Sequence, residues 1–89
     1  MKEIALFTEN EKEVMKPLLK AKEQGDHEAA AKFTEMWIQG CKRALAEYKK
    51  HPGDEIIEDD VTDLFPMDVK AKIAELEEEL AEAEHELRK

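Results

Sequence analysis

The strongest constraint on the fold is a regular run of apolar residues in the last quarter of the chain. Between residues 69 and 87 the apolar side chains recur at alternating spacings of four and three: Val69, Ile73, Leu76, Leu80, Ala83 and Leu87. These spacings put one apolar ridge along a helix, with alternate members at heptad positions a and d. Pro66 suits the first position of such a helix, and Asp68 suits its first turn. The sequence therefore predicts an amphipathic heptad helix over residues 66–89.

The charged residues beside this ridge restrict what it can pack against. Lys72, Glu79 and Glu86 occupy the g positions, and Glu77 and Glu84 occupy the e positions. In a parallel self-pair Glu79 would face Glu84, and like charges across a seam disfavour pairing. Three alternatives remain for covering the ridge: the less acidic first half of the same chain, that of a neighbouring copy, or a basic helix of another protein.

Helix signals also open the first half of the chain. Thr8 and Glu11 have the spacing of a capping box, which predicts a helix over residues 9–24. Pro17 is expected to kink or break this helix, because proline has no N–H and its ring collides with the preceding turn. The apolar stripe of the helix is expected to comprise Val14, Leu18 and Ala21, with Met15 and Leu19 beside it.

A second, longer helix is predicted over residues 27–51. Gly25 suits the left-handed position after a helix end, and Asp26 suits an N-cap. The Pro52-Gly53 pair ends the helix. Two merged apolar stripes predict a wide buried face: Ala30, Ala31, Phe33, Thr34, Trp37, Ile38, Cys41, Ala44, Leu45 and Tyr48.

Residues 54–65 show no clean periodicity and mix acidic with apolar side chains. A structureless loop of this length is uncommon in a compact domain. We therefore expect an acidic crossover segment that is extended, with one short helical turn around Asp60–Leu64. Its apolar side chains could pack within the chain or on a partner.

Together these elements predict an all-α fold. Residues 1–53 form an antiparallel helical hairpin, residues 54–65 cross over it, and residues 66–89 form a long acidic C-terminal helix. Because 89 residues build only a small core, we expect a three-helix or coiled-coil-like bundle that forms a homo-oligomer.

The charge is strongly segregated along the chain. Residues 1–53 carry ten basic and nine acidic side chains, whereas residues 54–89 carry four basic and fourteen acidic ones. With a net charge of −9, the chain is not expected to bind nucleic acid directly. The bland explanation is an acidic surface that keeps a small protein in solution.

Other features bear on the location of the protein. The first residues lack the apolar run of a signal peptide, and no stretch is apolar enough to span a bilayer. The single cysteine, Cys41, rules out an internal disulfide and fits a reducing compartment. A cytoplasmic protein without membrane contact is therefore expected.

We found no arrangement of residues that predicts catalysis. The chain has no serine, its three glycines are isolated, and Cys41 lies on an apolar helix face where thiols are usually inert. Glu82 and His85 have a spacing seen in di-metal bundles, but the heptad puts them on the solvent side. The expectation is a protein that is not an enzyme and has no cofactor and no metal. A metalloenzyme using Glu82 and His85 is the contrary hypothesis.

The favoured function is a protein-interaction module, acting as adaptor or inhibitor, that engages a basic surface of a protein partner through its anionic C-terminal half. In one form of this hypothesis it masks a nucleic-acid-binding surface. Trp37 would become an anchor if the C-terminal helix left it uncovered. The expected partner-binding residues are Asp54, Glu55, Glu58, Asp59, Asp60, Asp63, Phe65, Glu77, Glu79, Glu84 and Trp37.

The alternative is an oligomeric binder of a small anion or nucleotide, with its pocket between subunits. Its candidate ligand-binding residues are cations of the first half: Lys20, Lys22, Lys42 and Arg43.

Residues 23–30 also resemble the turn of a tetratricopeptide-type helix pair, or of the three-helix microtubule-interacting-and-transport module. The Gly25-Asp26 turn and Ala30 carry this resemblance. It implies at most a peptide-binding helical hairpin, because no second repeat follows.

Overall fold

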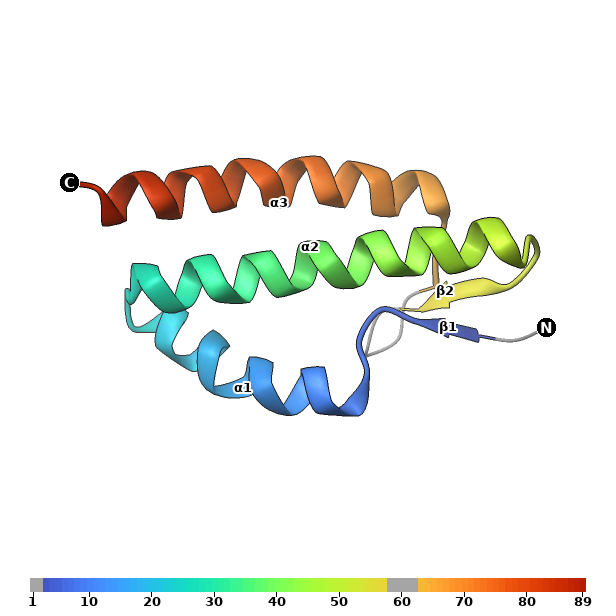
Figure 1. The fold of residues 1–89 in the computed structure, drawn as a ribbon, viewed down its shortest axis with the longest axis horizontal. Coiled ribbons are helices and arrows are strands. Elements are labelled where there is room, and N and C mark those ends of the chain that lie inside the picture. The colour runs from blue at the N-terminus through green and yellow to red at the C-terminus, as the bar shows by residue number, and fades with distance from the viewer. Residues whose placement is uncertain (1–2, 58–62) are drawn as a thin grey trace.

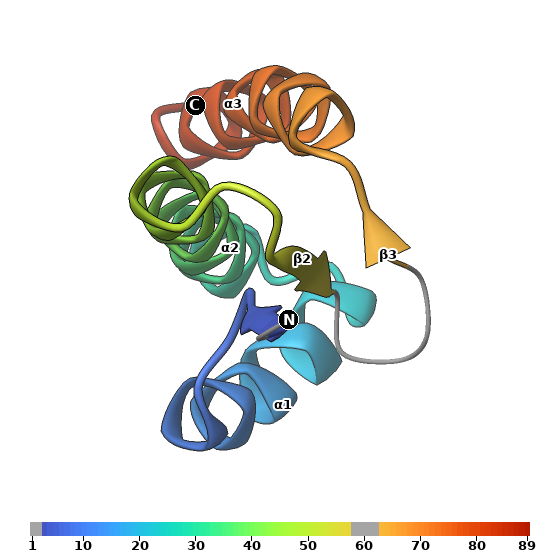
Figure 2. The same cartoon turned by 90° about the vertical axis from the view of Figure 1, so that its right-hand side faces the viewer.

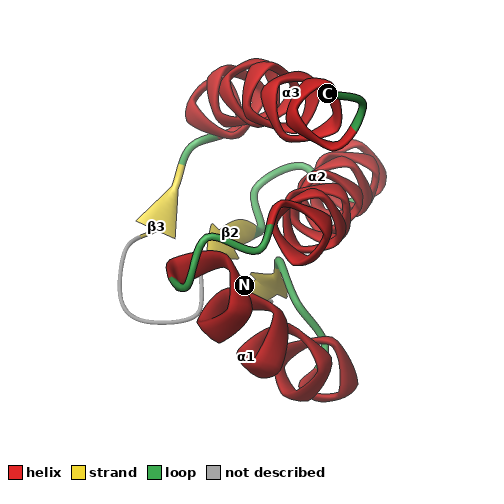
Figure 3. Cartoon of the chain, turned by 90° about the vertical axis from the view of Figure 1, so that its left-hand side faces the viewer, coloured by secondary structure: helices red, strands yellow, loops and turns green. Residues whose placement is uncertain are grey.

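The computed structural model describes residues 3–57 and 63–89, and this part of the chain is dominated by three helices (Figure 1). Helix α1 spans Glu9–Glu23, α2 spans His27–Lys50 and α3 spans Pro66–Leu87. The high helix content agrees with the predicted all-α class. Seen end-on, the helices follow one another in the order α1, α2, α3, with α2 in the middle (Figures 2 and 3).

A small sheet joins the beginning of the chain to the segment between α2 and α3. Strands β1 (Glu3–Ala5), β2 (Glu55–Ile57) and β3 (Asp63–Leu64) are paired in that order. β1 runs parallel to β2, whereas β3 runs antiparallel to it. The first two strands lie where α1 diverges from α2 (Figures 1 and 2). The sequence did not predict this sheet.

The predicted helical turn around Asp60–Leu64 is wrong at its end, because Asp63–Leu64 is a strand. The remainder of that prediction, residues 60–62, lies outside the described residues. Ile56 pairs with Ile4 on one side and with Leu64 on the other. Strand pairing between distant segments satisfies the hydrogen-bonding groups of the backbone, and a local sequence pattern does not predict which segments pair.

The apolar ridge of α3 is covered by α2 of the same chain. Val69, Leu76 and Ala83, the d positions, are all buried, while Ile73 and Leu80 are partly buried against the core. The ridge is therefore covered by the less acidic first half of the same chain, which is one of the three alternatives that the sequence left open. Leu87, the last member of the ridge, is 49% exposed.

Helix α1 contributes less to the core than its apolar residues predict. Met15 is its buried residue, whereas Val14 and Leu19 are exposed. Of the predicted stripe, Leu18 packs against the core and Ala21 is half-buried, so Val14 is its exposed member. Leu6 and Phe7, which precede the helix, are buried in the same core. We call residues 3–8 the N-terminal arm. Helix α1 continues through Pro17 without a break.

The local signals at the helix ends are confirmed. Thr8 and Glu11 form the predicted capping box. Gly25 has a φ of 88°, which a residue with a side chain rarely adopts. The Asp26 side chain accepts hydrogen bonds from the backbone N–H groups of Glu28 and Ala29. The helix ends are therefore set by residues that lie within a few positions of each cap.

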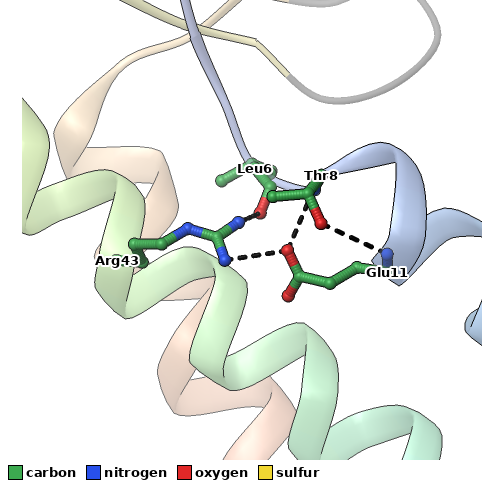
Figure 4. A network of polar contacts seen from close by, with 4 residues as sticks. All are labelled: Leu6, Thr8, Glu11 and Arg43. Carbon is green, nitrogen blue, oxygen red and sulfur yellow. Dashed lines mark hydrogen bonds and ion pairs between the residues drawn. The ribbon is translucent and has the colours of Figure 1, made fainter.

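The N-terminal arm is held against α2 by close packing and by one arginine. A Cβ atom at Gly40 would lie 2.6 Å from the Leu6 carbonyl oxygen, so only glycine permits this approach. Arg43 donates a hydrogen bond to the same oxygen at 2.7 Å and pairs with the Glu11 carboxylate at 2.8 Å (Figure 4). The Glu11 carboxylate also accepts from the Thr8 N–H.

These contacts affect the acidity of Glu11. Its partial burial alone would raise the pKa, but the hydrogen bonds from Thr8 and Arg43 outweigh it and lower the pKa of Glu11 below its ordinary value. The ionised carboxylate is therefore the form that connects the arm, α1 and α2.

Candidate functional site

A cavity of about 220 Å³ lies where α2 ends and α3 begins. We call it the Tyr48–Phe65 cavity. Residues from the end of α2, from the following turn, from β2 and from the start of α3 line it: Tyr48, Gly53, Asp54, Glu55, Ile56, Phe65 and Pro66.

The local structure explains how these residues come together. Gly53 has a φ of 105°, which turns the chain back from α2 into β2. Ile56 is 1% exposed and belongs to the core, so it fixes one side of the cavity. Phe65 is extended and caps α3, and the following Pro66 starts that helix. The Phe65 ring itself is 73% exposed.

The lining has the chemistry of a cation-binding site. Tyr48 and Phe65 supply aromatic rings, whose faces attract cations. Asp54 is half-buried and Glu55 is exposed, and carboxylates form strong charge-assisted hydrogen bonds with lysine and arginine. The described residues of the lining include no basic side chain. A cavity of this size and composition suits a single basic side chain.

The outer side of α3 extends this negative charge along the molecule. We call its exposed carboxylates the acidic face: Glu75, Glu77, Glu78, Glu82 and Glu84. Lys72 compensates one of these carboxylates in part, because its ammonium lies 4.0 Å from the Glu75 carboxylate as well as 4.8 Å from the Trp37 ring centroid. From Phe65 to Glu84 the helix extends for about 30 Å.

The structure separates the predicted partner-binding residues. It brings Asp54, Glu55 and Phe65 together in the cavity, and it puts Glu77 and Glu84 on the acidic face. Asp63 is in β3, and its side chain is not among those described. Glu58, Asp59 and Asp60 lie outside the described residues.

Two predicted residues have contacts within the chain. Glu79 forms an ion pair and hydrogen bond with Lys22, which ties α3 to α1. Trp37 is half-buried, in edge-on contact with Phe7 and Phe33 at centroid distances of 6.3 and 5.6 Å. Trp37 was predicted to anchor a partner only if the C-terminal helix left it uncovered. Lys72 of α3 lies over its ring, so this condition is not met on the side that faces α3.

Tyr48 was missed as a site residue. Its position in the apolar stripe of α2 predicted only a core role, and no local signal connects it to Phe65, 17 positions later. The pairing of β1 with β2 sets the path of the chain after Gly53, and this path decides that the two rings share a cavity.

Two of the four cations of the alternative hypothesis have partners within the chain, and its pocket between subunits stays a prediction. Lys22 binds Glu79, and Arg43 binds Glu11 and Leu6. Lys20 and Lys42 are exposed, and none of the four lines the Tyr48–Phe65 cavity. Glu82 and His85 are exposed on α3, as their heptad positions predict.

Comparisons with protein-family models, curated proteins and solved structures find no match for this chain. Within residues 3–57 and 63–89, none of the helices has the length and apolar character needed to cross a membrane.

Proposed function

We propose that this chain is a non-enzymatic interaction module that binds a basic segment of a partner protein. The observation that carries the proposal is the Tyr48–Phe65 cavity, a space of about 220 Å³ whose lining includes two aromatic and two acidic residues. An arginine or lysine side chain of the partner would enter this space, with its charge against the carboxylates and its stem against the rings.

The acidic face would add attraction over a longer range. Exposed carboxylates along α3 raise the rate of encounter with a basic partner and bias its orientation. A basic segment with one side chain in the cavity could continue along α3. Such binding would cover a basic surface of the partner, which is how the module would act as an inhibitor or adaptor.

The first test compares two neighbouring apolar truncations. Phe65→Ala removes a ring that lines the cavity, whereas Met67→Ala removes an 80% exposed side chain that does not line it. With a labelled arginine-rich peptide as the probe, Phe65→Ala should weaken binding about tenfold. Met67→Ala should leave it unchanged, and equal effects of both variants would contradict the proposal.

The second test concerns charge. Glu55→Gln should weaken binding of the same peptide, whereas Glu35→Gln, an equally exposed carboxylate on α2, should not. Binding should also weaken as salt rises from about 0.05 M to about 0.5 M, because ions screen exposed charges. Affinity that is constant over this range would reject charge-led recognition.

The finer points of the fold belong to the same proposal. In Figure 1, α1 and α2 both extend to the right from the turn that joins them and run in opposite chain directions, which supports an antiparallel hairpin that opens toward the N-terminal arm. The exposure of Val14, Met67 and Leu87 supports an oligomeric bundle in which a second copy covers apolar side chains outside the cavities. Light scattering over a range of concentrations measures the assembly, and a constant monomer mass would reject it.

A further inference from the structure

A second cavity lies between α1 and α2 and has the opposite chemistry. Its volume is about 210 Å³, and we call it the α1–α2 groove. Its lining comprises apolar residues and two lysines: Phe7, Lys12, Met15, Lys16, Leu19, Phe33 and Trp37.

Charge distinguishes this groove from the Tyr48–Phe65 cavity. Among the described residues that line it, the charged ones are Lys12 and Lys16, and none is a carboxylate. This is notable in a chain with 23 acidic and only 14 basic residues. The groove therefore combines an apolar floor with two lysines at its rim, of which Lys12 also pairs with Glu9 of α1 at 3.6 Å.

The dimensions of the groove suit a helix. Its lining on α1 extends from Lys12 to Leu19, which is about 10 Å or two helical turns. Leu19 is 42% exposed, so the groove is open along α1. Two apolar side chains one turn apart on a docked helix would cover such a length.

We propose that the α1–α2 groove binds an amphipathic helix of a partner protein that carries carboxylates beside its apolar side chains. The apolar side chains pack against Met15, Leu19 and the ring of Trp37. The carboxylates meet Lys12 and Lys16 at the rim. This site is separate from the proposed basic-segment site and takes a ligand of opposite charge, so the module would connect two partners.

A second copy of this chain does not supply such a helix. Its own acidic amphipathic helix is α3, and the ridge of α3 is buried against α2, with Val69 0% and Leu76 2% exposed. Docking α3 into another copy would require its removal from this interface.

The chain contains one tryptophan, and its position in the groove provides the measurement. The probe is a helical peptide with leucines one turn apart and glutamates beside them, without tryptophan. Titration should shift the Trp37 emission to shorter wavelength and should saturate. Lys16→Glu should weaken binding at least about fivefold, because it places a like charge at the rim. Lys42→Glu, an exposed charge reversal on α2 outside the groove, should leave binding unchanged.

A second variant separates loss of binding from loss of folding. Leu19→Gln removes apolar contact at an exposed position, so its circular dichroism should match that of the unaltered chain while its affinity falls. Three results would overturn the proposal. They are equal effects of Lys16→Glu and Lys42→Glu, equal binding of a peptide with lysines in place of the glutamates, and a saturating emission shift caused by the chain's own self-association or by decanoate in place of the peptide.

Binding of the acidic helical peptide to the α1–α2 groove should be independent of the proposed basic-segment site. Phe65→Ala alters the Tyr48–Phe65 cavity and leaves the groove lining intact. The acidic helical peptide should therefore bind this variant as it binds the unaltered chain. Loss of arginine-peptide binding with retained helix binding would show that the two sites act separately, and loss of both would reject the groove as a separate site.

Discussion

The α2–α3 interface and the N-terminal arm each bury a leucine almost completely, but only the leucine of α3 belongs to a sequence pattern that predicts its burial. Leu76 of α3 is 2% exposed and belongs to a regular heptad. Leu6 of the arm is 1% exposed and belongs to no repeat. The first is buried because a local pattern makes an amphipathic helix. The second is buried because distant segments pair. The comparison teaches that burial in so small a protein does not require periodicity.

The largest expected effect concerns the helical side of this comparison. Leu76→Ala should lower the free energy of unfolding by about 3 kcal/mol, because it leaves a cavity between α2 and α3. Leu87→Ala, at the 49% exposed end of the same ridge, should cost less than about 1 kcal/mol. Urea denaturation measures both. Equal losses would mean that the ridge is not buried as described.

The next effect concerns the arm. Alanine is a better helix former than glycine by about 1 kcal/mol, so Gly40→Ala would stabilise an ordinary helix. Here the new Cβ atom would lie 2.6 Å from the Leu6 carbonyl oxygen, and the arm must move. We expect a net loss of about 1–2 kcal/mol. Gln39→Ala, its exposed neighbour, serves as the control in thermal denaturation. A gain in stability from Gly40→Ala would contradict the packing of the arm on α2.

A smaller effect tests the charge that connects the arm to both helices. Glu11→Gln keeps the capping hydrogen bonds but removes the carboxylate charge, and it should cost about 1 kcal/mol at neutral pH. Because folding lowers the pKa of Glu11, its stabilisation is present above the unfolded-state pKa and is lost as pH falls through the folded-state pKa. Denaturation of both proteins at neutral and acidic pH measures the difference, which should shrink toward zero in acid. A constant difference would show that the carboxylate charge contributes nothing.

The smallest effect concerns the ion pair that joins α1 to α3. Glu79→Gln weakens the pair with Lys22 and should cost about 0.5 kcal/mol, because both side chains are partly exposed. Lys22 keeps its second contact, 5.3 Å from the Phe33 ring centroid. Added salt should reduce the difference between the two proteins. A loss well above 1 kcal/mol would indicate that α1 depends on α3 for its position.

The residues that sequence analysis placed correctly share one property, which is that their signals are local. The caps at Thr8 and Asp26 act within three residues, and the ridge of α3 repeats within one or two turns. The buried face of α1 was predicted in part: Leu18 packs against the core, whereas Val14 is exposed and Leu6 and Phe7 of the arm, which no pattern singled out, are buried.

The candidate site was found only in part for the same reason. Asp54, Glu55 and Phe65 stood out by their charge or aromatic character in an acidic segment. Tyr48 did not, because its role depends on the strand pairing that directs residues 55–57. The α1–α2 groove was missed as well, since it needs Phe7 of the arm beside Phe33 and Trp37 of α2.

The parallel pairing of β1 with β2 has a consequence for biosynthesis. β1 lies at the start of the chain, and its partner Ile56 leaves the ribosome more than fifty residues later. During translation β1 is therefore without its strand partner until residues 55–57 have been made, although the α2 residues that contact Leu6 and Phe7 are synthesised earlier. The parallel pair can close only as the last step that fixes the arm.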